Sequence, residues 1–465
     1  MPTPRATGPR ARAERTFGSL LDGPVFLREL AREPIVITHA RGAVLYDQDG
    51  KAYLDAAAGA AVASIGHGRR EVADVLHAQA MRVAYAHPSV FVTPPTIELA
   101  EKMIERAPAG FDHVFFTSGG SEAVEAAIKL ARQVHLAHGR TERRKIVSRR
   151  TSYHGATLGA LAVTDQAERV APFAGILRVE PKIAAHYPYR CPWCAGAGHC
   201  DLHCADDLER VIQAEGEDQV IAFIAEPIVG SSAPGTAGDA AYWRRIREIC
   251  DRHQVAFIAD EVMSGNGRSG HWWAMQRTRV TPDLITTAKG IGAGYASLGA
   301  LLVSGRMYDA FRSRRDDFRH GHTYSGHPLA AAVGSLVIDV IEREGLLARV
   351  RLMGDRLLAR LREALGEHPH VGEVRGQGLL LGVEFVADRA TRRPFDPALK
   401  LRTRVRQACL ERGLYIYPGG GSAGPLGGDH VLLAPPFVID EEQVDAIAGI
   451  LREGLDAALA ELPLG

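Results

Sequence analysis

The sequence predicts an α/β fold whose large domain contains a mainly parallel central sheet. Strands, glycine-containing turns and helices alternate over about 200 residues, which is the pattern of repeated βαβ units. The run Val220 to Ala225 is apolar at every position and of strand length, as expected for a central strand that is buried on both faces. With 465 residues, of which 46% are hydrophobic, the chain can bury a large core spread over two or three domains.

Hydrophobic periodicity and turn residues place the elements in order. Apolar residues at helical spacing predict helices, and short apolar runs bounded by glycine, asparagine or aspartate predict strands. A single buried strand is predicted at 374–384, and a loop is predicted at Gly419-Gly420-Gly421. Strands are expected at 35–37, 43–47, 53–55, 111–117, 146–148, 220–225, 256–262, 283–285, 298–303 and 374–384, and helices at 70–81, 96–106, 242–250 and 328–344.

Lys289 follows one of these strands and is a candidate catalytic residue. Lysine and arginine together number 55, yet only seven of them are lysines, so a basic residue in this chain is arginine by default. A lysine amine can lose its proton when it is desolvated and then condense with a carbonyl, whereas a guanidinium cannot. Taken alone, a solvated lysine at a strand end is the more common case.

Asp260 gives Lys289 a chemical context. It is the first of two carboxylates at the end of the apolar strand Ala256 to Val262 and precedes Lys289 by 29 residues. The carboxyl ends of parallel strands meet at one edge of a sheet, so both side chains are expected to face one crevice. Pyridoxal phosphate requires a lysine that bonds its aldehyde and a carboxylate beside its pyridinium nitrogen. The pair therefore predicts a pyridoxal 5'-phosphate site.

A phosphate site is predicted at the turn Ser118-Gly119-Gly120-Ser121, which joins the strand at 111–117 to a helix. Free backbone N–H groups and the helix dipole attract a phosphate there, and glycines let the backbone approach it closely. By itself such a turn is more often a simple helix cap. Together with Lys289 and Asp260 it is interpreted as the phosphate cradle of the cofactor.

Five motifs in order resemble the class III (ω-type) aminotransferases: Lys289, Asp260, Ser118 to Glu122, Tyr153-His154-Gly155 and His322 to Gly326. The resemblance covers about Pro34 to the C-terminus. It implies the type I fold of pyridoxal-phosphate enzymes, in which a smaller α/β domain is built from both termini. The implied division is a tail and lead-in at 1–33, the start of the small domain at 34–75, the large cofactor-binding domain at 76–330 with a cysteine-rich insertion at 182–206, and the rest of the small domain at 331–465.

The resemblance also implies roles for single residues. Thr323 would reach across a dimer interface to the phosphate in the partner subunit, and Arg375 would hold a substrate carboxylate, with a structural ion pair as the alternative for this arginine. Ala60, Ala61 and Val62 stand where many relatives have a bulky aromatic, which implies a wider pocket. The implied cofactor-binding residues are Gly120, Ser121, Tyr153, His154, Glu226, Asp260, Val262, Lys289 and Thr323, and the implied substrate-binding residues are Arg375 and Tyr85.

The predicted function is transfer of an amino group from an amine or amino acid to an oxo acid, pyruvate or 2-oxoglutarate. Lys289 would hold the cofactor as an internal aldimine and then move a proton as general base and acid. The resemblance implies a homodimer or a dimer of dimers. Two alternatives stay open at this point: an amino-acid racemase, epimerase or aminomutase on the same scaffold, and a zinc-stapled binding protein without catalysis.

Four cysteines, Cys191, Cys194, Cys200 and Cys204, follow the spacing C-x2-C-x5-C-x3-C. They offer enough soft ligands for a tetrahedral zinc. Similar aminotransferases, however, carry a Tyr-Arg-Cys-Pro insertion without a metal, and Tyr189 to Pro192 matches it. A surface loop without a metal is therefore expected, and structural zinc and a redox disulfide are the alternatives.

Charge and hydropathy restrict the partners. Basic and acidic residues both number 55, so nothing favours nucleic acid or an anionic membrane surface. No apolar run reaches the roughly 18–20 residues that span a bilayer. The first sixteen residues carry four arginines and no apolar segment, so they are expected to form a disordered tail rather than a secretory signal. A cytoplasmic protein is predicted.

Overall fold

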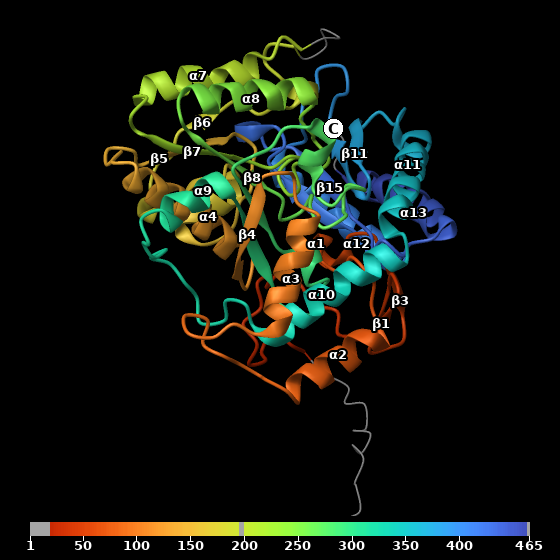
Figure 1. Cartoon of the computed structure of the whole chain (residues 1–465). Coiled ribbons are helices and arrows are strands. Elements are labelled where there is room, and N and C mark those ends of the chain that lie inside the picture. Colours follow the sequence, from red (N-terminus) through yellow and green to blue (C-terminus); the bar gives the residue numbers. More distant parts are fainter. Residues whose placement is uncertain (1–18, 195–199, 463–465) are drawn as a thin grey trace, which may run out of the picture.

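The computed structural model describes residues 19–194 and 200–462 of the chain. The predicted N-terminal tail lies outside these residues. The largest sheet has seven strands. In Figure 1 helices flank this sheet, and a second α/β unit lies beside it. No helix in the described ranges is long and apolar enough to cross a bilayer.

The central sheet has the strand order β4-β10-β9-β8-β7-β5-β6. Neighbouring strands from β9 to β6 pair in parallel, whereas β10 is antiparallel to both β9 and β4. The expected mainly parallel sheet is therefore confirmed. Its strands are β4 (Phe111–Thr117), β5 (Lys145–Arg149), β6 (Lys182–Ile183), β7 (Val220–Ala225), β8 (Ala256–Asp260), β9 (Leu284–Thr287) and β10 (Gly299–Ser304).

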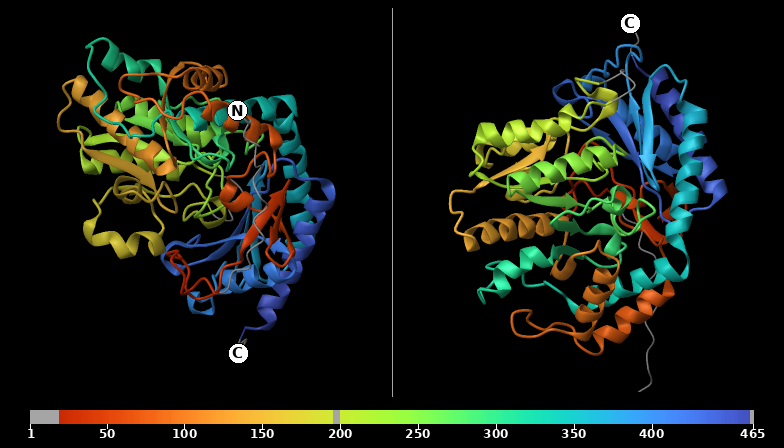
Figure 2. Two further views of the ribbon diagram at one scale, coloured as in Figure 1. Left: turned by 90° about the horizontal axis from the view of Figure 1, so that it is seen from below. Right: turned by 45° about the horizontal axis from the view of Figure 1, so that its top comes forward.

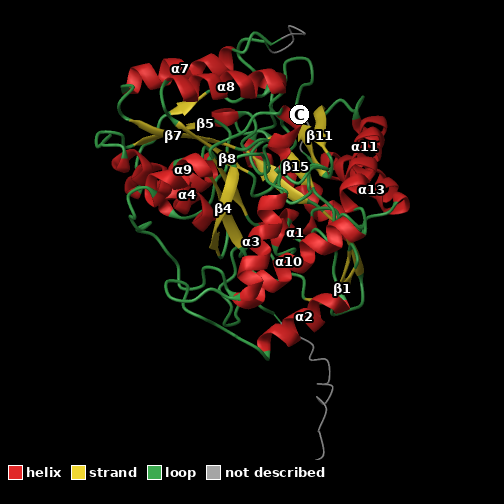
Figure 3. Cartoon of the chain, in the orientation of Figure 1, coloured by secondary structure: helices red, strands yellow, loops and turns green. Residues whose placement is uncertain are grey.

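Helices cover both faces of this sheet (Figure 3). On one face α4 (Gly120–Ala137) and α9 (Gly305–Arg312) pack against Ile224, Ile258 and Leu301. On the other, α3 (Pro94–Glu105), α7 (His203–Glu215) and α8 (Ala240–Arg252) pack against residues of the same strands that point the opposite way. Strands buried on both faces explain why β7 is apolar at every position.

Two smaller sheets form the second unit, seen beside the central sheet in Figure 2. One has the order β1-β2-β3-β13, so a C-terminal strand pairs in parallel with an N-terminal one. The other has the order β11-β12-β15-β14. The strands are β1 (Ile37–Arg41), β2 (Val44–Asp47), β3 (Ala52–Asp55), β11 (Val371–Gln377), β12 (Leu380–Phe385), β13 (Leu414–Tyr415), β14 (Tyr417–Gly420) and β15 (Asp429–Leu433).

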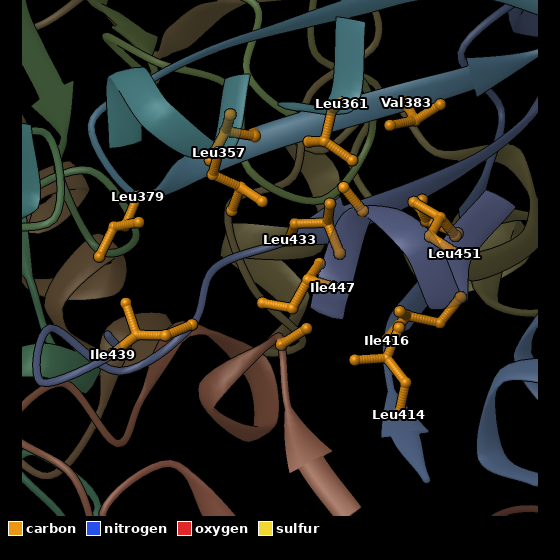
Figure 4. Close-up of a cluster of buried hydrophobic side chains, with 14 of the residues drawn as sticks. Leu357, Leu361, Leu379, Val383, Leu414, Ile416, Leu433, Ile439, Ile447 and Leu451 are labelled. Carbon is orange, nitrogen blue, oxygen red and sulfur yellow. The ribbon is translucent and has the colours of Figure 1, made fainter. Parts of the chain in front are cut away.

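Four long helices hold these smaller sheets: α10 (Pro328–Arg343), α11 (Leu346–Leu365), α12 (Leu401–Glu411) and α13 (Glu441–Ala460). Figure 4 shows Leu357 and Leu361 of α11 and Ile447 and Leu451 of α13 facing the strands. Full burial of each such side chain contributes about 1.5–3 kcal/mol of transfer free energy. The shorter helices are α1 (Ala58–Ala61), α2 (Arg70–Ala80), α5 (Leu158–Ala162) and α6 (Ala167–Val170).

Two sequence predictions are corrected by the structure. The segment 374–384 is not one strand but the hairpin β11–β12, which turns at Gly378 with a φ of +55°. A Cβ at Gly378 would lie 2.7 Å from the backbone carbon of Ser269, so the turn needs glycine. Gly419 and Gly420 belong to strand β14 rather than to a loop, because the side chains of His430 and Arg402 fill the space that a Cβ would occupy.

Candidate active site

Lys289 and Asp260 leave the same edge of the central sheet. Strands β8 and β9 are parallel neighbours, and Asp260 at the end of β8 lies opposite Thr286 of β9. Lys289 follows β9 by two residues, and the charges of Asp260 and Glu226 act on its amine. Asp260 is only 3% exposed. The amine and the acid are therefore brought to one buried crevice, as their positions after the strands predict.

The surroundings of Lys289 favour the neutral amine. Burial lowers the pKa of this lysine to about 8, while the carboxylates of Asp260 and Glu226 oppose the shift. Its Nζ donates a hydrogen bond to the carbonyl oxygen of Ala60 at 3.1 Å. Lys289 also has a φ of +48°, a strained conformation that is typical of functional residues. The amine is thus held in place and close to deprotonation at physiological pH.

Three donors orient the Asp260 carboxylate. Its Oδ2 lies 2.7 Å from Nδ1 of the buried His154. Its Oδ1 accepts from the Thr286 hydroxyl and from the Val262 backbone N–H, each at 3.1 Å. Because both oxygens are engaged, the carboxylate cannot rotate freely and presents a fixed acceptor edge. His154 therefore contributes to the crevice by orienting the Asp260 carboxylate.

Glu226 ends the strand next to β8 and is also buried. Its carboxylate accepts from the backbone N–H of Tyr153 at 3.2 Å and of Gly230 at 3.0 Å. Burial raises the pKa of Glu226, with the charge of His154 opposing and that of Asp260 adding to the shift. The carbonyl of the same residue accepts from Arg149. Tyr153 and Glu226 are thereby fixed beside Asp260.

The N-terminus of α4 forms a cradle at the same edge. Gly119, the residue before the helix, is extended, and no side chain caps the first turn. The Ser121 hydroxyl accepts from the Ala156 N–H at 3.0 Å. A Cβ on Gly120 would stand 2.9 Å from a methyl group of Val262, so only glycine lets the helix start lie against this wall. Uncapped N–H groups at the end of an 18-residue helix suit a phosphate.

Tyr85 and Thr323 lie apart from this cluster. Both are exposed, and the Tyr85 hydroxyl donates to the carbonyl of Thr323 at 3.0 Å. Among the contacts of the described residues, neither one touches Lys289, Asp260 or Glu226. The chain by itself therefore brings seven of the predicted site residues together, Gly120, Tyr153, His154, Glu226, Asp260, Val262 and Lys289, with Ser121 at the same helix start.

Arg375 is part of a buried ion-pair network in strand β11. Its guanidinium donates to the carbonyl of Pro234 at 2.9 Å and pairs with Glu373 at 2.8 Å and Glu384 at 3.2 Å. It also stacks over the ring of Tyr187 at 4.7 Å. These contacts are of the kind expected for a structural ion pair, which is the alternative role of Arg375.

Arg169 of α6 was missed by the sequence reading. Its guanidinium lies over the ring of Tyr153 at 4.8 Å and donates to Tyr417 at 3.4 Å. Within the described chain it has no carboxylate partner, and its charge acts on Lys289. In an arginine-rich chain no local pattern distinguishes this residue, because Tyr153 and Tyr417 meet it only in the folded chain.

The residues present fit pyridoxal phosphate in their chemistry. A buried lysine amine with a lowered pKa, an oriented carboxylate, an aromatic side chain and an uncapped helix start surround one crevice. These groups match the aldehyde, the ring nitrogen, the ring face and the phosphate in turn. The fit rests on the set of donors rather than on any single residue.

Comparison with known proteins agrees with this reading. Residues 27–455 match the protein-family model described as Aminotransferase class-III. The chain is 36% identical to the uncharacterized aminotransferase YodT of Bacillus subtilis, over 92% of this chain and 96% of YodT. Among solved structures, an (S)-enantioselective omega-transaminase from Thermomicrobium roseum has 36% identity and a TM-score of 0.85, over 95% of this chain and 97% of that one. The omega transaminase from Pseudomonas jessenii in complex with PMP has 30% identity and a TM-score of 0.87, over 96% of this chain and 99% of that one.

Proposed function

Because the chain belongs to the class III aminotransferases, we propose that its transfer of amino groups depends on Lys289 and Asp260. The fold is the type I fold of this family, and the cofactor is pyridoxal 5'-phosphate. The racemase, epimerase and aminomutase alternative is not favoured, since the relatives are named aminotransferases and transaminases. The observation that carries the proposal is the placement of both side chains at the carboxyl ends of β8 and β9.

When bound, the cofactor supplies an electron sink and carries the amino group between the two substrates. Lys289 would hold the cofactor through its aldehyde in the resting enzyme. When free of the cofactor, the Lys289 amine would take a proton from the donor carbon as a base and return it as an acid. A pKa of about 8 suits both roles near neutral pH.

The other residues hold the cofactor in place. Asp260 would keep a proton on the ring nitrogen, and its hydrogen bonds from Thr286 and His154 set its direction. Gly120 and Ser121 at the start of α4 would bind the phosphate. Tyr153 and Val262 would contact the ring, and Glu226 would lie near its hydroxyl.

Two arginines are candidates for the substrate carboxylate. Arg375 has this role by resemblance, although it already has carboxylate partners. Arg169 has none among the described residues and lies over Tyr153, so its charge is available to an oxo acid such as pyruvate or 2-oxoglutarate. The small side chains of Ala60, Ala61 and Val62 favour a donor with a bulky group beside its amine, because the Ala60 carbonyl contacts Lys289 directly.

We further propose that the active form is a homodimer, alone or as a dimer of dimers, in the cytoplasm. The hydrogen-bonded pair Tyr85 and Thr323 supports this, since both residues are exposed in the single chain. In the dimer Thr323 would complete the phosphate cradle of the partner subunit, and Tyr85 would line the entry of the substrate.

The test is a panel of amine donors with pyruvate or 2-oxoglutarate as acceptor. The wild-type enzyme is expected to form the aminated acceptor, and Lys289→Ala to lose this activity together with the visible absorption of the lysine-bound cofactor. Lys182→Ala is the control, because Lys182 lies on the edge strand β6 and should leave both unchanged. Inversion of a chiral donor without net amine transfer would instead identify a racemase.

A further inference from the structure

Four of the six cysteines gather in one place that the aminotransferase reaction does not use. Cys191, Cys194 and Cys200 lie in the segment between β6 and α7, and Cys204 is in the first turn of α7. All four thiols are free of disulfides. Cys191, Cys194 and Cys204 are buried, with exposed fractions of 5%, 9% and 1%. The burial of three thiols in this part of the chain suggests that they have a structural role.

The sulfur atoms converge. Nδ1 of His186 and the sulfurs of Cys200 and Cys204 all lie within 4.8 Å of one another. The His186 nitrogen is 3.4 Å from the Cys204 sulfur, and the Cys194 thiol is within hydrogen-bonding reach of the Cys191 and Cys200 thiols. Separations of 3.4 Å and of at most 4.8 Å are compatible with the roughly 3.8 Å between ligand atoms that Zn–S bonds of about 2.3 Å produce in a tetrahedron.

The charge around the cluster suits an anionic metal centre. Arg149 is 2% exposed and forms no ion pair with a carboxylate in the described chain, and its charge acts on the Cys204 thiol. A zinc ion with four thiolates carries a net charge of −2, which a buried guanidinium would offset. Carboxylates, which would favour harder cations, are absent from the donor group formed by described residues.

We propose that this cluster binds one structural Zn²⁺ through the thiolates of Cys191, Cys194, Cys200 and Cys204. Binding converts four thiols into thiolates and releases their four protons to solvent. His186 lies outside the four ligands and donates its Nδ1–H to the Cys204 sulfur, the kind of supporting hydrogen bond that orients a metal ligand. Four protein ligands leave no open position, so the ion stabilises the chain and takes no part in catalysis.

The position of the cluster explains what the zinc would stabilise. Tyr187 and Arg190 lie between His186 and Cys191, and both bind Glu384 of β12. Glu384 in turn pairs with Arg375. The segment that carries the zinc ligands therefore connects the central sheet to the C-terminal sheet beside Arg375. Loss of the zinc is expected to weaken this contact.

The first test is the metal content of the purified protein. Elemental analysis is expected to find about one zinc per chain, and the protein prepared with Co²⁺ should show intense thiolate-to-cobalt absorption with the visible bands of a tetrahedral ion. Protein without zinc, with four thiols joined as two disulfides by mass spectrometry, would overturn the proposal. So would zinc-free protein that gives no cobalt thiolate spectrum.

Variants locate the metal. Cys194→Ala and Cys204→Ala are expected to lose at least nine-tenths of the zinc and to unfold at a lower temperature. The matched control is Cys250→Ala, because Cys250 is an equally buried free cysteine in α8, and this variant should keep the full zinc content. If a ligand variant fails to fold, the cobalt spectrum of the wild-type protein still decides. Full zinc content in both ligand variants would contradict the proposal.

Discussion

At the scale of single residues, the buried carboxylates of Asp260 and Glu261 are neighbours in sequence but differ in role. Asp260 faces the cofactor crevice, whereas Glu261 accepts from the backbone N–H groups of Ala274 and Met275, each at 2.9 Å. Burial raises the pKa of Glu261 to about 7. Of these two adjacent acids, Asp260 therefore faces the cofactor crevice, whereas Glu261 stabilises the fold.

Asp260→Asn is expected to lower kcat by about 10²- to 10³-fold, which corresponds to about 3–4 kcal/mol of lost transition-state stabilisation. The amide has the size of the carboxylate but cannot hold a proton on the ring nitrogen. Steady-state kinetics with a saturated cofactor measures the effect. Glu261→Gln serves as the control and should reduce thermal stability while leaving kcat of the folded enzyme within a few-fold. Equal losses of kcat in both variants would show that Asp260 is only structural.

Arg169→Met is expected to raise KM for the oxo acid by about 10- to 100-fold, the loss of a charge-assisted hydrogen bond, with little change in KM for an uncharged amine donor. Arg375→Met tests the other candidate, and the exposed Arg150→Met controls for net charge. A rise confined to Arg375→Met would return the carboxylate contact to the residue that the resemblance indicates.

At the scale of elements, short apolar runs and glycine turns were informative. The strands at 111–117 and 220–225 were predicted with the limits that the structure has, because continuous apolar stretches followed by polar or glycine residues leave little ambiguity. The strand predicted at 256–262 ends earlier, at Asp260. The sequence could place three residues at one edge of the sheet, because each lies at or just after the end of such a strand: Gly120, Asp260 and Lys289.

Features that depend on contacts between distant segments could not be predicted. The hairpin at Gly378 was read as one strand because the residues on both sides of the turn are apolar. The strand at Gly419 and Gly420 was read as a loop because the reason for glycine there, the side chains of His430 and Arg402, comes from other elements.

The start of α4 gives a prediction at the same scale. Gly120→Ala is expected to weaken cofactor binding about 10-fold or more, because the new methyl group would press on Val262 at 2.9 Å and push the helix start away from the phosphate. Titration of the apoenzyme with pyridoxal phosphate measures this affinity. Gly449→Ala, at a glycine of α13 with free space for a Cβ and ordinary helical backbone angles, is the control. Unchanged affinity in Gly120→Ala would exclude this turn as the phosphate cradle.

At the scale of the whole molecule, the smaller unit joins both ends of the chain. Strand β13 pairs with β3, and the apolar cluster of that unit contains residues from Ala56 to Leu462. The domain limits at 75 and 330 stay a prediction. Because the crevice lies where the two units meet the carboxyl ends of the central strands, the pairing of the termini helps to set its shape.

The proposed dimer is testable by mixing variants. Thr323→Val alone is expected to weaken cofactor binding, since each site would lose a phosphate contact from the partner subunit. Heterodimers of Thr323→Val with Lys289→Ala should pair every Lys289-containing site with a partner that retains Thr323, and so recover wild-type cofactor affinity in that site. A monomer by light scattering, or no recovery on mixing, would contradict a contact between subunits.

The most direct test of the central claim is to find which lysine bonds the cofactor. The enzyme loaded with pyridoxal phosphate is reduced with borohydride, digested and analysed by mass spectrometry, after loading of the apoenzyme at a series of pH values. The cofactor mass is expected on the peptide that contains Lys289, and the rate of attachment should rise with pH through about 8, where this buried amine loses its proton. Attachment to another of the seven lysines, or a rate that rises only toward the ordinary lysine pKa, would contradict the account.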